Sequence, residues 1–144
     1  MLPEHREAIR GTTDSEHLFH MLLSMKQKGN SRALIEVLRD GLREVLSWDL
    51  ASGESDASSL NVIWTDGVEL VASRVGRTLW YTERRAVLDC EICGSPHVRH
   101  SQGAAYRAVV VASEPLTHGE EWTEVPERTL LRVGPESDLE LQPL

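Results

Sequence analysis

The sequence predicts an α+β protein, because two helix patterns are followed by a run of short strand patterns. The helix patterns cover about residues 14–28 and 32–47, and the strand patterns run from about residue 60 to residue 133. No stretch alternates strand and helix as parallel βαβ units do, so antiparallel strands are expected. A length of 144 residues suits one domain, residues 1–144, with a helical part at about 13–47 and a strand-rich part at about 60–133.

The first helix has a clear start signal and a clear stop signal. Thr13 and Glu16 have the T-x-x-E spacing of a capping box, in which Glu16 would bond the cap residue's own N–H. Gly29-Asn30 then supplies residues that tolerate positive φ. The apolar side chains of this helix lie around most of its circumference, so burial on two sides is expected. The second helix is apolar on one face only: Leu34, Ile35, Leu38, Leu42, Val45 and Leu46.

The strand patterns follow a Ser- and Gly-rich loop at residues 51–59. The turn signal Thr65-Asp66-Gly67 lies between two β-rich runs and predicts a hairpin. Residues 106–112 include a continuous apolar run, which predicts a central strand buried on both faces. Further strands are expected at 60–64, 68–72, 78–82, 122–125 and 129–133, whereas residues 83–105 and the tail at 136–144 are expected to be irregular.

Charge and composition exclude several classes of protein. Lys plus Arg total 15 and Asp plus Glu total 23, for a net charge of −8, which argues against a nucleic-acid partner because phosphate contacts need clustered cations. No apolar run reaches the roughly 18–20 residues of a membrane span. The polar N-terminus has no signal-peptide core. We therefore expect no membrane partner and a cytoplasmic location. No cofactor is expected, and the sequence has no Gly-rich phosphate loop.

Cys90, Cys93, His97 and His100 form the most conspicuous metal-like cluster of the sequence. Their spacing, C-x2-C-x3-H-x2-H, brings four zinc-ligand side chains into eleven residues. The Cys-to-His gap is shorter than in ordinary zinc fingers, and no thioredoxin-like βαβ unit accompanies the two thiols. A structural zinc, a redox pair and an ordinary polar loop all stay open, and the sequence favours the polar loop without metal.

Asp14 falls in the first turn of the first helix. The helix dipole and the unpaired backbone N–H groups favour a negative charge there, so helix initiation alone accounts for this residue. The alternative, less favoured from this pattern alone, is that Asp14 binds the ammonium group of a substrate. His17 and His20 share one face of the same helix and are interpreted as partly buried or polar-face residues.

Three stretches of the chain carry a resemblance when they are taken together and in order. They are G-T-T-D-S-E-x-L-F at residues 11–19, L-N-x-x-x-T-D-G-x-x-L-x-A-x-R at 60–74, and V-V-A-S-E-P-L-T at 110–117 followed by W-x-x-V-P at 122–126. This set resembles the C-terminal portion of a class II glutamine amidotransferase domain, the type with an N-terminal nucleophile. The similarity is greatest to small stand-alone members such as the ergothioneine-pathway amidohydrolase.

The resemblance implies a fold, an activity and a set of site residues. The fold would be part of a four-layer α/β/β/α sandwich with antiparallel strands, lacking the half that carries the nucleophile. The activity would be hydrolysis of the amide of glutamine or of a γ-glutamyl compound, with release of ammonia. Asp14 would hold the α-ammonium of the substrate, and Ser113 and Glu114 would support the same cleft.

The N-terminal residues depart from the family pattern. The family uses a cysteine directly after the initiator Met as nucleophile, whereas Leu2 and Pro3 stand here. Its substrate-binding Arg and its oxyanion Asn-Gly segment precede the T-D-S-E stretch, and only ten residues precede Gly11. We therefore expect no catalytic residue in this chain, which would be a truncated portion that is inactive on its own.

Two alternative functions stay open at this stage. One is a non-catalytic binding or assembly module whose protein partner supplies the missing N-terminal half. The other is a small zinc-loop protein. A chain that lacks half of a sandwich would also expose sheet edge and apolar surface.

Overall fold

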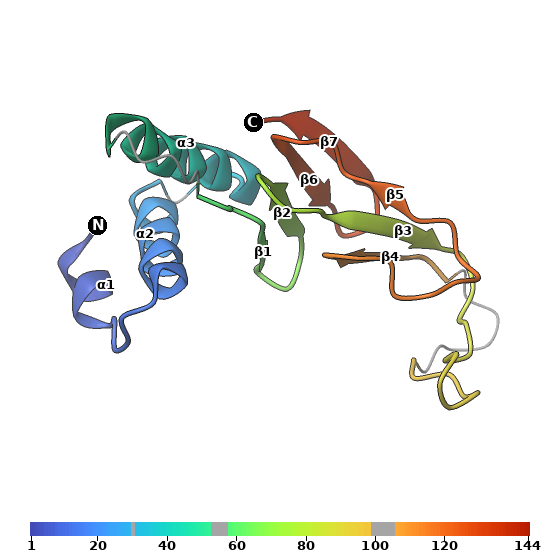
Figure 1. Cartoon of the computed structure of the whole chain (residues 1–144). Coiled ribbons are helices and arrows are strands. Elements are labelled where there is room, and N and C mark those ends of the chain that lie inside the picture. The colour runs from blue at the N-terminus through green and yellow to red at the C-terminus, as the bar shows by residue number, and fades with distance from the viewer. Residues whose placement is uncertain (30, 53–57, 99–105) are drawn as a thin grey trace.

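The computed structural model describes residues 1–29, 31–52, 58–98 and 106–144. In this part of the chain three helices precede seven strands (Figure 1). The helices are α1 (Pro3–Glu7), α2 (Asp14–Lys28) and α3 (Leu34–Ser52). The strands are β1 (Val62–Thr65), β2 (Leu70–Arg74), β3 (Trp80–Arg84), β4 (Ala108–Ala112), β5 (Thr123–Glu124), β6 (Thr129–Val133) and β7 (Leu139–Pro143).

The strands form two antiparallel sheets. Sheet A has the order β1-β2-β6-β7, and sheet B has the order β4-β3-β5. All pairings in both sheets are antiparallel, including the predicted hairpin of β1 and β2. The α+β class and the antiparallel arrangement predicted from the sequence are therefore confirmed.

Sheet A has a hydrophobic core on each of its faces. Val71 and Leu130 pack toward α2 and α3, together with Leu22, Leu34, Leu38 and Leu42 of the helices. Their neighbours Ala72 and Leu131 pack in a second cluster with Leu79 and Val125 and with side chains of sheet B. This change of side from one residue to the next is the period-2 alternation of a strand. The described residues thus form three layers: helices, sheet A and sheet B.

Helix α2 packs against α3 on one face and against α1 on another. Met21, Leu22 and Ser24 are its buried residues, whereas Phe19 is 45% exposed. Gly41 of α3 allows the close approach of the two helices, since a Cβ at that position would clash with the Leu22 side chain. On the other face, the Leu2 N–H donates to the Ser24 hydroxyl and the His5 side chain bonds that of Gln27. The structure thus agrees with the expectation that α2 is covered on two sides, although Phe19 stays exposed.

Two predictions about strands were wrong. Residues 108–112, expected as a central strand, form the edge strand β4, which is half-buried along its whole length. An apolar run indicates that a segment prefers burial, but it does not say which strands become its neighbours. Residues 139–143, expected in a loose tail, form β7 and pair with β6, where Leu141 lies opposite Leu131.

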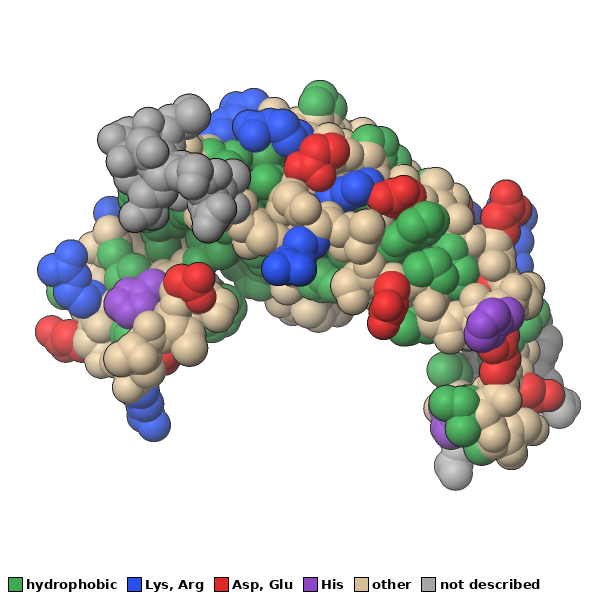
Figure 2. All heavy atoms as spheres, in the orientation of Figure 1, with side chains coloured by type: hydrophobic (Ala, Val, Ile, Leu, Met, Phe, Trp, Pro, Cys, Tyr) green, Lys and Arg blue, Asp and Glu red, His purple; other side chains and the backbone are tan. Residues whose placement is uncertain are grey.

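The molecule has the shape of an arch (Figure 2). The helices lie at one end, and residues 85–98, which follow β3, project from the other end (Figure 1). Helix α3 extends to Ser52, beyond its predicted end at residue 47, and most of the predicted loop at 51–59 lies outside the described residues. In the described ranges, no helix combines the length and the apolar character needed to cross a membrane.

Candidate functional site

The main candidate site is a pocket of about 620 Å³ at the helical end of the molecule. One face of α2 supplies residues at the i, i+3, i+4 and i+7 positions, and α3 supplies two residues one turn apart. The segment that enters β1 closes a further side. The lining residues are Met1, Asp14, Ser15, His17, Leu18, Met21, Val45, Trp48, Ser58, Ser59, Leu60, Asn61 and Val62.

The start of α2 is stabilised by Thr13 and Glu16. The Thr13 side chain accepts a hydrogen bond from the Glu16 N–H, at 3.4 Å. The Glu16 carboxylate accepts from the N–H groups of Arg10 and Gly11, at 2.9 and 2.8 Å, and not from that of Thr13 as the capping-box pattern predicts. These backbone donors, Arg10 first and then Gly11, lower the pKa of Glu16. The chain before the helix folds back onto Glu16, which brings earlier N–H groups within its reach.

Asp14 retains an available oxygen at the wall of the pocket. Its Oδ1 accepts a hydrogen bond from the Ser15 N–H at 2.7 Å. Within the described residues, no hydrogen bond or ion pair engages Oδ2, and the residue is exposed. Because Thr13 and Glu16 provide the side-chain capping bonds, helix initiation does not use the whole carboxylate. Asp14 can therefore present a negative charge to a ligand.

Asn61 lines the same pocket, but its side chain is engaged by the protein. Its Nδ2 donates to the carbonyl oxygens of Arg77 and Thr78, at 3.0 and 2.9 Å, and its Oδ1 accepts from the Val75 N–H at 3.0 Å. These bonds fasten the turn between β2 and β3 to the segment that enters β1. Asn61, the second residue of the L-N signature, thus lines the pocket, but its side chain has a structural role.

The T-D-G part of the second motif forms the turn of the β1–β2 hairpin. The Thr65 hydroxyl donates to the Glu69 carbonyl and accepts from the Gly67 N–H. Asp66 Oδ1 accepts from the N–H groups of Val68 and Glu69, and these donors, Glu69 first, lower the pKa of Asp66. Gly67 has φ +88°, a conformation that glycine adopts readily. The motif therefore specifies a turn, and none of its three residues lines the pocket.

Ser113 and Glu114 do not line the pocket with Asp14. Both residues are exposed and follow the end of β4. The Ser113 carbonyl accepts a hydrogen bond from the Thr78 hydroxyl at 2.9 Å. Since Asn61 also binds the Thr78 carbonyl, a chain of contacts joins this strand end to the pocket wall. The structure thus brings Asp14 and Asn61 to one cavity and leaves both supporting candidates outside it.

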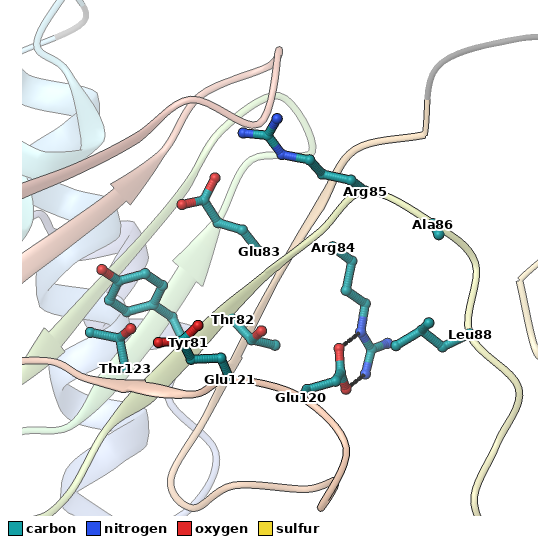
Figure 3. A pocket seen from close by; sticks show the side chains of 10 residues that line it. All are labelled: Tyr81, Thr82, Glu83, Arg84, Arg85, Ala86, Leu88, Glu120, Glu121 and Thr123. Carbon is teal, nitrogen blue, oxygen red and sulfur yellow. Dashed lines mark hydrogen bonds and ion pairs between the residues drawn. The ribbon is translucent and has the colours of Figure 1, made fainter.

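A second pocket, of about 570 Å³, lies beside β3 (Figure 3). Arg84 and Glu120 face each other in it and form two hydrogen bonds of 2.6 Å. Each residue shifts the pKa of the other toward the charged form: the hydrogen bond raises the pKa of Arg84 and lowers that of Glu120. In this ion pair, the two least exposed charged side chains of the pocket neutralise each other. Asp14, Ser113 and Glu114 do not line this second pocket.

The cysteine–histidine cluster lies far along the chain from Asp14, between β3 and β4. Its residues Cys90, Cys93 and His97 come together, whereas His100 lies outside the described residues. The N–H groups of Cys93 and Ile92, followed by the His97 side chain, lower the pKa of the Cys90 thiol to about 7. None of the three residues lines either pocket.

His17 and Trp48 are among the residues of the main pocket that were not assigned to a site from the sequence. His17 lies one helical turn after Asp14 on the same face, and this spacing is a signal that was available. Trp48, which is 53% exposed, comes from the opposing helix. No local pattern in the sequence relates Trp48 to Asp14, because their proximity depends on the packing of α3 against α2.

The sequence and the structure were compared with known proteins. The family profile described as glutamine amidotransferases class-II matches residues 3–135. None of the curated proteins compared with the sequence matches it.

Several solved structures match this chain, among them two that share its fold. One is a glutamine aminotransferase class-II domain protein from Silicibacter pomeroyi, with a TM-score of 0.65 and 24% identity over 99% of this chain and 56% of that one. The other is a predicted glutamine amidotransferase from Pseudomonas aeruginosa, with a TM-score of 0.65 and 21% identity over 90% of this chain and 50% of that one. The chain thus spans about half the length of the solved structures it matches. Because the family profile covers most of the sequence, the chain belongs to the class II glutamine amidotransferases.

Proposed function

We propose that this chain forms the substrate-binding part of a domain that hydrolyses the amide of glutamine, or of a γ-glutamyl compound, and releases ammonia. Asp14 binds the α-ammonium group of the substrate. The observation that carries this proposal is the carboxylate of Asp14, which lines a pocket while one of its oxygens has no partner among the described residues.

The pocket suits a small amino-acid substrate in size and in character. Its volume of about 620 Å³ lies in the range of roughly 300–1,000 Å³ typical of small-molecule sites. Leu18, Met21 and Val45 provide apolar surface for the methylene groups of a glutamine side chain. The carboxylate at the entrance of α2 then fixes the charged end of the molecule by charge-assisted hydrogen bonds.

The proposal assigns the nucleophile and the oxyanion donors to protein outside these 144 residues. Cys90 and Cys93 are the two cysteines of the chain, and neither lines the pocket of Asp14. In the family that the chain resembles, a cysteine attacks the amide, and donors near it stabilise the negative charge that develops on the oxygen. On this proposal the chain alone binds substrate and does not turn it over.

Glutamine binding by the chain tests the role of Asp14. Isothermal titration should show binding that is about 10–100-fold weaker in Asp14→Asn, the ratio expected when a hydrogen bond to a charged group of roughly 1.5–3 kcal/mol is lost. Glu36→Gln is a matched control, since Glu36 is an exposed acidic residue in the first turn of α3 and does not line the pocket. Equal affinity in the wild type and Asp14→Asn would contradict the proposal.

Ammonia release tests the assignment of the catalytic groups. The chain and a version extended by the sequence that precedes it in its genome are assayed with glutamine. We expect no turnover by the chain, turnover by the extended protein, and loss of that turnover in Asp14→Ala. A stable complex with a partner protein that never releases ammonia would instead indicate the non-catalytic assembly module.

A further inference from the structure

Two thiols and one imidazole point toward one another in the connection between β3 and β4. The sulfur atoms of Cys90 and Cys93 and a ring nitrogen of His97 all lie within 4.8 Å of one another. Cys93 Sγ and His97 Nε2 lie 3.2 Å apart. Cys90 is partly exposed, and the other two residues are exposed, so a metal ion can reach the cluster from solvent.

The backbone around the thiols already has the form of a closed turn. The Gly94 N–H donates to the Cys90 carbonyl at 2.8 Å, and the Cys90 N–H donates to the Ser95 carbonyl at 3.0 Å. Gly94 has φ +68°, in the left-handed region that favours glycine, which lets the chain reverse directly after Cys93. This turn brings the two sulfurs to the same side.

A backbone donor is also directed at one of the sulfurs. The Ile92 N–H donates to Cys90 Sγ at 3.4 Å. Metal-bound thiolates are oriented and stabilised by hydrogen bonds of this kind from outside the ligand set. The turn therefore supplies two ligands together with a supporting contact for the sulfur.

The segment that carries this turn has no hydrophobic core of its own. None of residues 85–98 is buried, and Ile92, between the two cysteines, is 96% exposed. A short segment that buries so little apolar surface cannot offset its conformational entropy by packing. Small structures with this deficit are commonly held by a disulfide or by a metal ion.

We propose that Cys90, Cys93 and His97 bind one Zn²⁺ ion. Tetrahedral zinc with Zn–S and Zn–N bonds of about 2.3 and 2.0 Å needs ligand atoms roughly 3.5–3.8 Å apart, so the cluster reaches this geometry through movements of about 1 Å or less. Water supplies the fourth ligand in this proposal. His100, the fourth residue of the sequence pattern, lies outside the described residues and is not part of the assignment.

The zinc has a structural role, because the turn that it holds contacts another loop. Glu91, between the two cysteines, accepts hydrogen bonds from the N–H groups of His118 and Gly119, at 3.0 and 3.2 Å. That loop also contains Glu120, the partner of Arg84 at the end of β3. A zinc ion on the cysteines thus fixes Glu91 and, through it, the connection between β4 and β5.

Zinc binding deprotonates the two thiols and leaves the oxidation state of their sulfur atoms unchanged. Each thiol releases its proton to solvent as its thiolate coordinates the ion, and neutral His97 donates a lone pair. A Cys90–Cys93 disulfide would instead require an oxidant to remove two electrons and two protons. The two states differ in mass and in the number of titratable thiols, so they can be told apart.

Metal content of the whole chain, purified without chelators and without a histidine tag, tests the proposal. We expect about one zinc per chain by mass spectrometry of the elements, and loss of most of it in Cys90→Ser and in Cys93→Ser. Replacement by Co²⁺ should give the thiolate-to-cobalt charge-transfer band and the visible bands of a tetrahedral site. Both serine variants should keep the circular dichroism of the wild type, because residues 85–98 lie outside both hydrophobic cores.

His118→Ala is the matched control, since His118 contacts Glu91 and is absent from the ligand cluster. It should retain the zinc, whereas His97→Ala should weaken zinc binding at least tenfold in a competition titration. Fewer than about 0.1 zinc per chain with no uptake of added Zn²⁺ would overturn the proposal. A disulfide between the two cysteines in the protein as isolated, or equal zinc content in His97→Ala and His118→Ala, would also overturn it.

Discussion

The two ends of the molecule are held in place by different forces. The pocket of Asp14 lies where α2 and α3 rest on sheet A, and fully buried residues such as Leu22 and Leu38 fix the helices that line it. At the other end, polar contacts of Glu91 attach the cysteine turn to its neighbouring loop. Because a hydrophobic core supports it, the pocket of Asp14 is formed before a ligand binds. The turn that carries Cys90 and Cys93 has no such core and should become more ordered when it binds a metal ion.

The largest effect should come from removing a core side chain under the pocket. Leu38 lies on α3 and is 0% exposed. Leu38→Ala removes buried methyl groups and leaves a cavity, which should cost roughly 2–5 kcal/mol of the free energy of unfolding. Urea denaturation followed by circular dichroism measures the loss.

The control for this change lies at the other end of the molecule. Ile92 is 96% exposed, so Ile92→Ala should change the free energy of unfolding by less than about 0.5 kcal/mol. If the two variants lost similar stability, the contrast between a packed end and an unpacked end would be incorrect.

The second-largest loss of stability should come from breaking the ion pair of Arg84 and Glu120. This pair lies between the core and the exposed turn. The Glu120 side chain is 9% exposed and that of Arg84 is 23% exposed. Glu120→Gln removes the charge while keeping the shape, and should cost about 1.5–2 kcal/mol because Arg84 loses a charged partner. Thermal unfolding of the two proteins at pH 7 measures the difference.

The contribution of the Arg84–Glu120 pair to the stability of the protein should fall as the pH is lowered. The hydrogen bonds from Arg84, and then that from Thr117, hold the pKa of Glu120 below its ordinary value. A carboxylate whose pKa is lower in the folded state stabilises the protein above its unfolded pKa, near 4.3, and loses this contribution as the pH falls through the folded pKa. The gap between wild type and Glu120→Gln should therefore narrow below about pH 4. A constant gap down to pH 3 would contradict this assignment.

The most predictable parts of the fold were the helices and strands whose two ends are marked by capping residues, glycine or proline. Helix α2 occupies residues 14–28 as predicted, because Thr13 caps its start and Gly29 follows its end. Strand β6 occupies its predicted residues 129–133, between Pro126 and Pro135. The position of β4 at a sheet edge and the pairing of β7 depend on contacts with distant segments. No local pattern carries that information.

The candidate site was predictable only through the motifs. The signature around Asp14 indicated a ligand-binding carboxylate, and the structure places that residue in a pocket. The resemblance also grouped Ser113 and Glu114 with Asp14, although neither residue lines the pocket. Much of each motif maintains the fold, as Asn61 and Asp66 show by their hydrogen bonds. A motif match therefore marks residues that matter without separating ligand contacts from structural ones.

Asn61 allows that separation to be tested. Asn61→Ala removes the three hydrogen bonds that fasten residues 75–78, and should cost about 1–1.5 kcal/mol because the site is partly exposed to water. Glutamine affinity of the folded variant should change less than threefold, because both polar atoms of the Asn61 side chain are engaged by the protein. A loss of affinity as large as that of Asp14→Asn, with stability unchanged, would make Asn61 a ligand-binding residue.

The smallest effect should come from Thr13, which separates helix initiation from ligand binding at the entrance of α2. Its hydroxyl accepts a hydrogen bond from Glu16 N–H at 3.4 Å, a long contact, so Thr13→Ala should cost only about 0.5–1 kcal/mol. Amide hydrogen exchange should quicken in the first turn of α2 while the rest of the helix is unchanged. Because Glu16 still holds the N–H groups of Arg10 and Gly11, the helix entrance keeps its shape and Asp14 keeps its place. Glutamine affinity in Thr13→Ala should thus stay within about threefold of the wild type, and a loss as large as that in Asp14→Asn would show that capping, rather than the Asp14 charge, governs the pocket.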